Sequence, residues 1–268
     1  MPARTAPPGQ AIRCQHLSKT YRGGSGEVEA VRDVTITFEA GKTTALVGSS
    51  GCGKSTVLRL IAGLEEPSRG TVTIGAESPA ELRARAGLSM AFQDASLLPW
   101  RSVFGNIALG LKLARRSADP DAVHRLIRLV GLDGFEAAQP AELSGGMRQR
   151  AAIARCLVSM PELLLLDEPF GAVDELTRQR LNEDLPALWA AQGATALLVT
   201  HSISEAVLLS DRVLVFSPRP ARIVADIPVV LDGSRNFSWT QTPEFRAEVE
   251  NVAAALRSGE EPSAIAAQ

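Results

Sequence analysis

The hydrophobic pattern of this chain changes period, from residue-by-residue alternation near the N-terminus to helical spacing further on. Residues 11–47 contain short alternating runs, such as Thr35–Phe38, and a compact β-rich run at Thr43–Val47. Glu39–Lys42 has the composition of a turn between them. After a glycine-rich stretch, residues 54–62 follow a helical pattern that Gly63 ends. The pattern therefore predicts short strands with turns, followed by a helix.

Residues 70–92 have the pattern of a strand, a helix and a second strand, and residues from about 95 to 160 are mainly helical in spacing. Asp119-Pro120 is a good helix start, because Asp caps a helix and Pro fits its first position. The next apolar residues are spaced i, i+3, i+4 and i+7 and so share one face: Val123, Leu126, Ile127 and Val130. We expect this region to be a helical subdomain.

The apolar run Leu163–Leu166 has the length and composition of a strand buried on both faces, as in a parallel sheet. A helix (about 175–191), a strand (195–200), a helix (203–209) and a strand (212–217) follow in the pattern. This alternation predicts an α/β fold with a parallel sheet and a helical insertion between its halves.

Composition indicates where these parts begin and end. Residues 1–10 are rich in Pro and Ala and are expected to be a flexible N-terminus. Residues 11–231 would form the main domain, with the helical subdomain at about 95–160. Residues 232–268 turn polar and Ala-rich, which predicts a C-terminal helical extension with a loose tail.

Charge and cysteine content narrow the classes of function. The net charge of −2 argues against a general nucleic-acid binder, which usually has a clear basic excess. The three cysteines form no CxxC pair, which favours a reducing cytosol. No apolar run reaches the ~18 residues that span a bilayer. If the protein works at a membrane, another chain must hold it there.

The strongest motif is a glycine-rich stretch that fits GxxxxGK[ST] and lies between a predicted strand and a predicted helix, as that motif requires. Its backbone N–H groups would surround phosphate oxygens, and the helix N-terminus would add partial positive charge. Lys54 would reach the β- and γ-phosphates, and the Ser55 hydroxyl would bind Mg²⁺. The motif predicts ATP contacts by Gly48, Ser49, Ser50, Gly51, Cys52, Gly53, Lys54, Ser55 and Thr56.

An acidic pair, Asp167-Glu168, directly follows the apolar strand at 163–166. The carboxyl ends of parallel strands are where α/β sheets bind ligands, so Asp167 could hold Mg²⁺ through water. Glu168 would then orient or deprotonate the attacking water. Such a pair can also be a loop start or a helix cap, but its combination with the phosphate loop favours catalysis.

A third motif, Leu143–Arg150 with the sequence LSGGMRQR, resembles the signature sequence of ATP-binding cassette (ABC) ATPases. Further matches follow in the family's order: Tyr21, Gln93, the D-loop segment Gly171–Asp174 and His201. The resemblance covers about residues 11–225. It implies a P-loop NTPase of the ABC type, with a mostly parallel core sheet, an N-terminal antiparallel β subdomain and an inserted helical subdomain.

The resemblance also implies roles for the matched residues. Tyr21 would stack on adenine, Gln93 would contact ATP and Mg²⁺, and His201 would contact the γ-phosphate. The residues expected to act on the ATP held by a second subunit are Ser144, Gly145, Gly146 and Gln149, with Asp174 in the D-loop. Two alternatives stay open, because a lone tyrosine is often core packing and a lone histidine after a strand is often a cap.

Family kinship implies the partners as well. Two cassettes would dimerise head to tail, as a homodimer, so that Lys54 of one and Ser144 of the other serve one ATP. The segment Asp94–Arg101 would dock a transmembrane permease, with Leu97, Leu98 and Trp100 as anchors, although Trp100 could instead pack within the helical subdomain. The protein would then lie at the cytoplasmic face of the cell membrane.

The sequences of three segments, residues 94–101, 147–150 and 217–220, most resemble the importer branch for nitrate, sulfonates and taurine. Importers of that branch use a solute-binding protein. The alternatives are a soluble ABC ATPase acting on DNA or ribosomes, and an exporter cassette. The first lacks support because the chain has no second cassette, coiled-coil insertion or basic tract. We therefore predict an importer ATPase with ATP and Mg²⁺ as cofactors and no nucleic-acid partner.

Overall fold

The computed structural model describes residues 8–23, 26–230 and 237–260. Its chain divides into two compact units. Unit 1 comprises Met1–Ala11, Glu39–Lys42 and Ala80–Ala196, and unit 2 comprises Ile12–Phe38, Thr43–Pro79 and Leu197–Gln268. Most of the predicted flexible N-terminus and the predicted loose tail lie outside the described residues.

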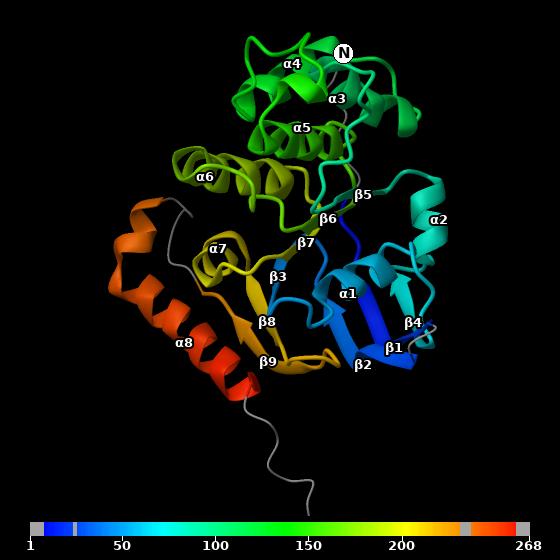
Figure 1. The fold of residues 1–268 in the computed structure, drawn as a ribbon, viewed down its shortest axis with the longest axis vertical. Helices are drawn as coiled ribbons and strands as arrows, with labels where there is room; N and C mark the ends of the chain where they lie inside the picture. The colour runs from blue at the N-terminus through cyan, green and yellow to red at the C-terminus, as the bar shows by residue number, and fades with distance from the viewer. Residues whose placement is uncertain (1–7, 24–25, 231–236, 261–268) are drawn as a thin grey trace, which may run out of the picture. The chain divides into compact units, whose positions relative to one another are not determined.

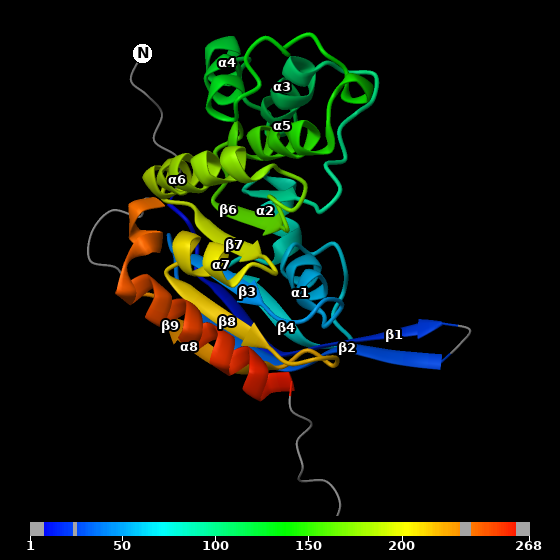
Figure 2. The ribbon, with the colours of Figure 1, turned by 60° about the vertical axis from the view of Figure 1, so that its left-hand side comes forward.

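Unit 2 contains an antiparallel sheet with the strand order β2-β1-β4. Its strands are β1 (Ile12–Gly23), β2 (Gly26–Phe38) and β4 (Arg69–Ile74), and β1 and β2 form a long hairpin (Figure 2). The prediction of short strands was wrong here, since β1 and β2 are 12 and 13 residues long. Three register shifts in β1 interrupt the alternation, so one continuous strand has the sequence pattern of several short ones.

A second set of strands in unit 2 positions the glycine-rich loop. β3 (Thr43–Val47) is buried throughout and runs parallel to β8 (Arg212–Phe216), and β9 (Ile223–Pro228) pairs with β8 antiparallel. The sequence pattern did not predict β9, because only Ile227 in it is buried. After the loop comes α1 (Lys54–Ile61), the helix predicted from the sequence.

Helices also cover this second set of strands. α7 (Ile203–Leu209) packs on β3 and β8, and α8 (Pro243–Glu260) packs on α7, β8 and β9 (Figure 1). A short 3₁₀ helix, η2 (Phe237–Gln241), precedes α8, and Trp239 meets Phe245 edge to face with ring centroids 4.9 Å apart. The helix predicted after residue 232 is therefore present as α8.

Unit 1 holds two parallel strands and most of the helices. β5 (Leu88–Ala91) pairs with β6 (Leu163–Asp167), all of which is buried. The helices are α2 (Pro79–Ala84), α3 (Val103–Leu113), α4 (Pro120–Leu129), α5 (Gly145–Leu157) and α6 (Glu175–Ala191), with a 3₁₀ turn η1 (Pro140–Glu142). β7 (Thr195–Val199) begins in unit 1 and ends in unit 2.

The helical region of unit 1 has the predicted internal organisation. α4 begins as expected, since the Asp119 side chain accepts a hydrogen bond from the Ala122 N–H at 2.8 Å and Pro120 occupies the first turn. Val123 and Ile127 are buried, and α3 packs against both α4 and α5 (Figure 1). Among the described residues, no helix has both the length and the apolar character needed to cross a membrane.

The predicted fold class is confirmed. Parallel core strands and an antiparallel sheet are both present, and a group of helices lies between β5 and β6 in sequence. One detail differs, because β4 follows the glycine-rich loop in sequence and yet completes the antiparallel sheet. The domain boundaries at residues 11, 95, 160 and 231 stay predictions.

Candidate functional site

The glycine-rich loop of unit 2 connects β3 to α1 and has a backbone that only glycine adopts easily. Gly51 and Gly53 have φ values of 71° and 127°. A β-carbon on Gly53 would lie 2.5 Å from the Ala30 carbonyl oxygen, closer than any such contact allows. The loop therefore needs glycine at position 53 both for its backbone angles and for space.

Lys54 occupies the interior of this loop. Its side chain is buried, and Nζ donates to the carbonyl oxygens of Gly48 at 2.8 Å and Ser49 at 2.9 Å. The Sγ of Cys52 lies 3.6 Å from the same nitrogen. No side chain caps the N-terminus of α1. A buried ammonium beside the positive end of a helix suits a phosphate group, so the loop fits a nucleotide triphosphate.

Tyr21 lies on β1 and does not belong to the core, since 37% of it is exposed. Its hydroxyl donates to Glu65 Oε2 at 2.5 Å, and Lys19 Nζ lies 5.1 Å from the ring centroid. Burial, followed by the hydrogen bond to Glu65, raises the pKa of Tyr21. The core-packing alternative for Tyr21 is therefore not what the structure shows.

His201 follows β7 and is exposed. The helix that begins next, α7, is capped by Ser202, whose Oγ accepts a hydrogen bond from the Glu205 N–H at 3.3 Å. The loop is further fixed by Thr200, whose hydroxyl donates to the Glu205 carboxylate and accepts from the Ser202 N–H at 3.0 Å. Ser202, rather than His201, is thus the cap of α7.

Unit 1 brings Gln93, predicted to contact ATP and Mg²⁺, beside Glu168, predicted to activate water. β6 ends at Asp167, which is buried, and Glu168 follows with a φ of 47°. Gln93 Nε2 donates to Glu168 Oε2 at 3.2 Å. The helix-cap alternative for the acidic pair does not apply, because α6 is capped by Asp174.

The signature segment opens α5, with the Ser144 Oγ accepting from the Met147 N–H at 3.2 Å. A β-carbon on Gly146 would lie 2.7 Å from the Ala172 carbonyl oxygen, so this glycine allows close packing against the D-loop. Gln149 is buried, and its Nε2 donates to the Phe92 carbonyl at 3.1 Å. Its expected contact in trans stays a prediction, and within this chain the amide supports the residue preceding Gln93.

Asp174 ends the D-loop segment and caps α6, accepting a hydrogen bond from the Thr177 N–H at 3.0 Å. That hydrogen bond, the largest cause, and the charge of Arg150 lower the pKa of Asp174. The carboxylate is consequently held ionised at the start of the helix, where negative charge is favoured.

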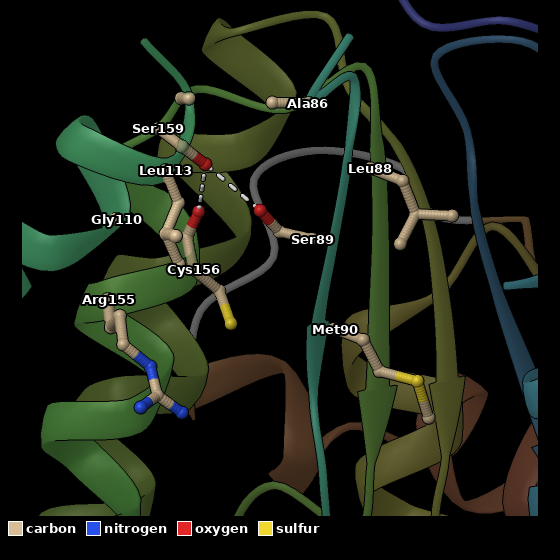
Figure 3. A pocket seen from close by; sticks show the side chains of 10 residues that line it. Ala86, Leu88, Ser89, Met90, Gly110, Leu113, Arg155, Cys156 and Ser159 are labelled. Carbon is tan, nitrogen blue, oxygen red and sulfur yellow. Dashed lines mark hydrogen bonds between the residues drawn. The ribbon is translucent and has the colours of Figure 1, made fainter. Parts of the chain in front are cut away.

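A pocket of about 260 Å³ lies between β5, the end of α3 and α5 of unit 1 (Figure 3). On one side Ser159 Oγ lies 2.9 Å from Ser89 Oγ and donates to the Cys156 carbonyl at 2.8 Å. Leu113, 68% exposed, and Arg155 also line it. Arg155 donates to the carbonyls of residues 95 and 96, so the pocket adjoins the segment that follows Gln93.

Sequence reasoning missed three residues that touch these features, namely Glu65, Arg155 and Arg219. Glu65 binds the Tyr21 hydroxyl, and Arg219 donates to the Gly51 carbonyl of the glycine-rich loop. None of them belongs to a catalytic motif. No local pattern could have indicated their contacts, because their partners are distant in sequence.

The comparisons with known proteins agree with this geometry. A family model described as "ABC transporter" matches residues 31–171. The chain belongs to the ABC transporter family. The taurine import ATP-binding protein TauB of Rhizobium johnstonii is 46% identical, over 93% of this chain and 98% of that protein. The nitrate import ATP-binding protein NrtD of Synechocystis sp. is 40% identical, over 91% of this chain and 94% of that protein.

A solved ABC structure is also similar. The dimeric post-hydrolysis state of the ATP-binding cassette MJ0796, bound to ADP and Pi, matches with a TM-score of 0.74 and 26% identity, covering 82% of this chain and 100% of that one. This ABC protein is therefore an ATP-binding ATPase with the cassette fold. Its phosphate loop, Tyr21 and His201 belong to unit 2, and its Gln93, acidic pair, signature and D-loop belong to unit 1.

Proposed function

We propose that this chain is the ATP-hydrolysing subunit of an importer that takes up a small anion such as a sulfonate, taurine or nitrate. The observation that carries the ATP-dependent part is the phosphate loop wrapped around the buried Lys54 ammonium. The assignment to an importer rests on sequence similarity, because the similar proteins named above are import ATP-binding proteins. That kinship favours an importer over a soluble ATPase acting on DNA or ribosomes.

The phosphate loop, residues 48–56, would hold the triphosphate. On nucleotide binding, Lys54 would exchange its contacts with the Gly48 and Ser49 carbonyls for contacts with the β- and γ-phosphates. The N–H groups at the start of α1, where the N-cap residue is Gly53, would donate to phosphate oxygens. Tyr21, partly exposed on β1, would stack on the adenine.

Magnesium would be held by the Ser55 hydroxyl, Gln93 and Asp167, the last of these through water. Oxygen donors of this kind suit Mg²⁺, which keeps several waters and binds phosphates. The described part of the chain contains no cluster of three or more His, Cys, Asp or Glu side chains suited to a metal. Bound Mg²⁺ would supply positive charge that offsets the negative charge of the triphosphate.

Hydrolysis would use Glu168 as the group that orients or deprotonates water. The hydrogen bond from Gln93 to Glu168 Oε2 fixes the carboxylate at the end of β6, and a positioned base is what proton abstraction needs. His201 would contact the γ-phosphate from the loop that Ser202 and Thr200 hold in place. These roles divide the reaction between binding by unit 2 residues and water activation by unit 1 residues.

A second copy of the chain would complete the site. The similar MJ0796 cassette is dimeric, which supports a homodimer here. In such a dimer Ser144, Gly145 and Gly146 would face the γ-phosphate held by the partner copy, with Asp174 nearby in the D-loop. Gln149 would belong to the same contact in trans, and its hydrogen bond to the Phe92 carbonyl would hold α5 beside the residue that precedes Gln93. Removal of the γ-phosphate by hydrolysis would then loosen the dimer.

A permease would bind unit 1 at the segment of residues 94–101. Trp100 is 71% exposed, so this large apolar side chain is available to a partner and is not used for packing within the helical region. Arg155 holds the segment by donating to the carbonyls of residues 95 and 96. The chain would thereby lie at the cytoplasmic face of the membrane, and a solute-binding protein would deliver the anion to the permease.

The test is transport by the chain reconstituted with its permease in liposomes. ATP would be enclosed with the cassette, and uptake of labelled taurine, an alkanesulfonate and nitrate measured with the solute-binding protein outside. We expect uptake of one anion class, with none for Lys54→Ala. Uptake that continues without ATP hydrolysis, or the absence of a membrane partner together with copurified nucleic acid, would overturn the proposal.

A further inference from the structure

The turn formed by residues 217–222, between β8 and β9, closes on itself and is anchored to β2. The Ser217 N–H donates to the Arg222 carbonyl at 2.9 Å, and the Ser217 hydroxyl accepts from the Arg222 N–H at 3.1 Å. The Ala221 N–H donates to the Ala30 carbonyl at 2.9 Å, and the Ala221 carbonyl accepts from the Arg32 N–H at 3.0 Å. Any side chain presented by this 217–222 turn therefore starts from a fixed backbone.

The phosphate loop lies directly against this turn and the residue before it, at all three of its glycines. A β-carbon on Gly48 would meet the Phe216 carbonyl oxygen at 2.9 Å, and one on Gly53 would meet the Ala221 β-carbon at 2.9 Å. A β-carbon on Gly51 would lie 3.5 Å from Arg219 Nη2. The turn and Phe216 thus lie against the phosphate loop at residues 48, 51 and 53.

Arg219 is the side chain of the turn that hydrogen-bonds to this loop. Its Nε and Nη2 both donate to the Gly51 carbonyl oxygen, at 3.2 and 2.7 Å. Because a trans peptide directs its C=O and the following N–H to opposite sides, this contact turns the Cys52 N–H away from Arg219. The Cys52 N–H accordingly points across the loop, to the Ser49 carbonyl at 3.3 Å.

Glycine at position 51 allows the Gly51–Cys52 peptide to rotate. Its φ of 71° lies in the left-handed region, where glycine exchanges conformations at little cost. A rotated Gly51–Cys52 peptide would point its carbonyl oxygen into the loop, toward the negative phosphates. Arg219 opposes this rotation, since a guanidinium held by an anchored turn makes a charge-assisted hydrogen bond to the outward carbonyl.

We propose that Arg219 is a positioning residue for nucleotide binding, which holds the Gly51–Cys52 peptide with its N–H inside the loop, where a phosphate oxygen would replace the Ser49 carbonyl as its acceptor. The proposal rests on the function proposed above for residues 48–56. Arg219 does not touch the nucleotide in this account. Arg219 raises the fraction of molecules whose phosphate loop can bind nucleotide. When that fraction falls, the apparent affinity for nucleotide falls in proportion.

The experiment measures ADP binding to the full chain by calorimetry, because ADP binding involves no turnover. Arg219→Ala is expected to weaken binding by roughly three- to tenfold, the scale of losing one ordinary hydrogen bond. Arg219→Lys should be intermediate, because an ammonium keeps the charge but not the two parallel donors. Arg222→Ala, an exposed arginine of the same turn, should bind within about twofold of the unsubstituted chain, the effect of removing a surface charge.

Measuring ADP binding at high salt distinguishes a positioning role of Arg219 from a general effect of its charge. At about 0.5 M salt, surface charge effects are largely screened, so the loss in Arg219→Ala should persist only if geometry is the cause. Full recovery by Arg219→Lys together with disappearance of the effect in salt would overturn the proposal. Unchanged ADP binding in Arg219→Ala, or an equal loss in Arg222→Ala, would overturn it too.

Lys54→Ala separates this proposal from the function on which it rests. Loss of ADP binding in Lys54→Ala with normal binding in Arg219→Ala would reject the role of Arg219 and leave the phosphate loop in place. Normal binding in Lys54→Ala would reject the proposed phosphate site itself. Melting of the nucleotide-free variants, expected to match the unsubstituted chain for both Arg219 variants, shows that the turn is intact.

Discussion

Tyr21 on β1 donates a hydrogen bond of 2.5 Å to Glu65, which follows α1, so the residue expected to stack on adenine is tied to the helix that follows the phosphate loop. This pair restrains the tyrosine ring on a partly exposed strand, where an unrestrained ring would sample several rotamers. A restrained ring loses less entropy when a base stacks on it.

Glu65→Gln should therefore change the titration of Tyr21, which is the only tyrosine of the chain. Burial and Glu65 raise its pKa above the ordinary 10.0. Removing the carboxylate should lower the tyrosine pKa part of the way back, as read from tyrosinate absorbance near 295 nm. Glu66→Gln is the matched control, because only the backbone carbonyl of Glu66 contacts Lys19. Identical titrations of the two variants would contradict the assignment.

The same shift has a consequence for stability at high pH. The pKa of Tyr21 is higher in the folded protein than in the unfolded chain. Protonated Tyr21 therefore stabilises the fold fully below pH 10.0, and this contribution is lost as pH rises through the folded pKa. Denaturation measured between neutral pH and the alkaline range should show a smaller decline for Tyr21→Phe, which has no proton to lose. An equal decline in both proteins would show that other groups govern the alkaline loss.

Glu168→Gln should bind ATP but release phosphate at least about 100-fold more slowly, the usual scale for losing a general base. The amide keeps the size of the side chain and the neighbouring Gln93, so ATP should accumulate and hold two copies together. Size-exclusion chromatography with ATP and a phosphate-release assay measure both effects. Glu183→Gln, the same change on an exposed position of α6, should behave as the unsubstituted chain. Normal phosphate release would remove Glu168 from the base role.

Gly53→Ala should destabilise the protein by about 2 kcal/mol or more, from backbone strain and overpacking. The new β-carbon would meet the Ala30 carbonyl oxygen at 2.5 Å, where φ is already 127°. Gly105→Ala, within α3, is the control. Its new β-carbon would meet nothing closer than 3.4 Å, and alanine is more stable than glycine inside a helix by about 0.5–1 kcal/mol. Urea denaturation tests both, and equal stabilities of the two variants would refute the steric account.

Arg85 pairs with Glu162, whose side chain is only 4% exposed, and its Nη2 donates to Oε2 at 2.8 Å. Arg85→Met should cost about 2 kcal/mol, less than a fully buried pair because Arg85 is itself 41% exposed. Adding Glu162→Met should recover most of that loss by removing the unpaired carboxylate. Arg83→Met, exposed on α2 two residues before Arg85, should be near neutral. A double variant that is less stable than the single one would contradict the prediction.

Trp100→Ala should prevent copurification of the cassette with its permease, because large buried aromatic side chains contribute strongly to interfaces. Phe135→Ala is a suitable control, since Phe135 is also a large exposed apolar side chain, 44% against 71% for Trp100. Pull-down of the tagged permease from membranes measures the difference. Retention of the complex by Trp100→Ala would place the docking surface elsewhere.

The sequence alone determined the motifs and most of the secondary-structure order. The phosphate loop around Lys54, the acidic residue at the end of β6 and the cap at Asp119 are local patterns, in which neighbouring residues act together. Such features need only the chain's own spacing, so they could be predicted. The long strand β1 escaped prediction because its bulges shift the alternation, and β9 because little of it is buried.

Tertiary structure decided which residues support the motifs. Glu65 reaches Tyr21 across 44 positions of sequence, and Arg219 reaches Gly51 across 168. Whether His201 or Ser202 caps α7, and whether Trp100 is exposed, also depends on how the segments pack. The physical reason is that a polar contact between distant residues is created by the topology of the strands that carry them. Hydrophobic spacing specifies which face of an element is buried, and leaves its polar partners to the fold.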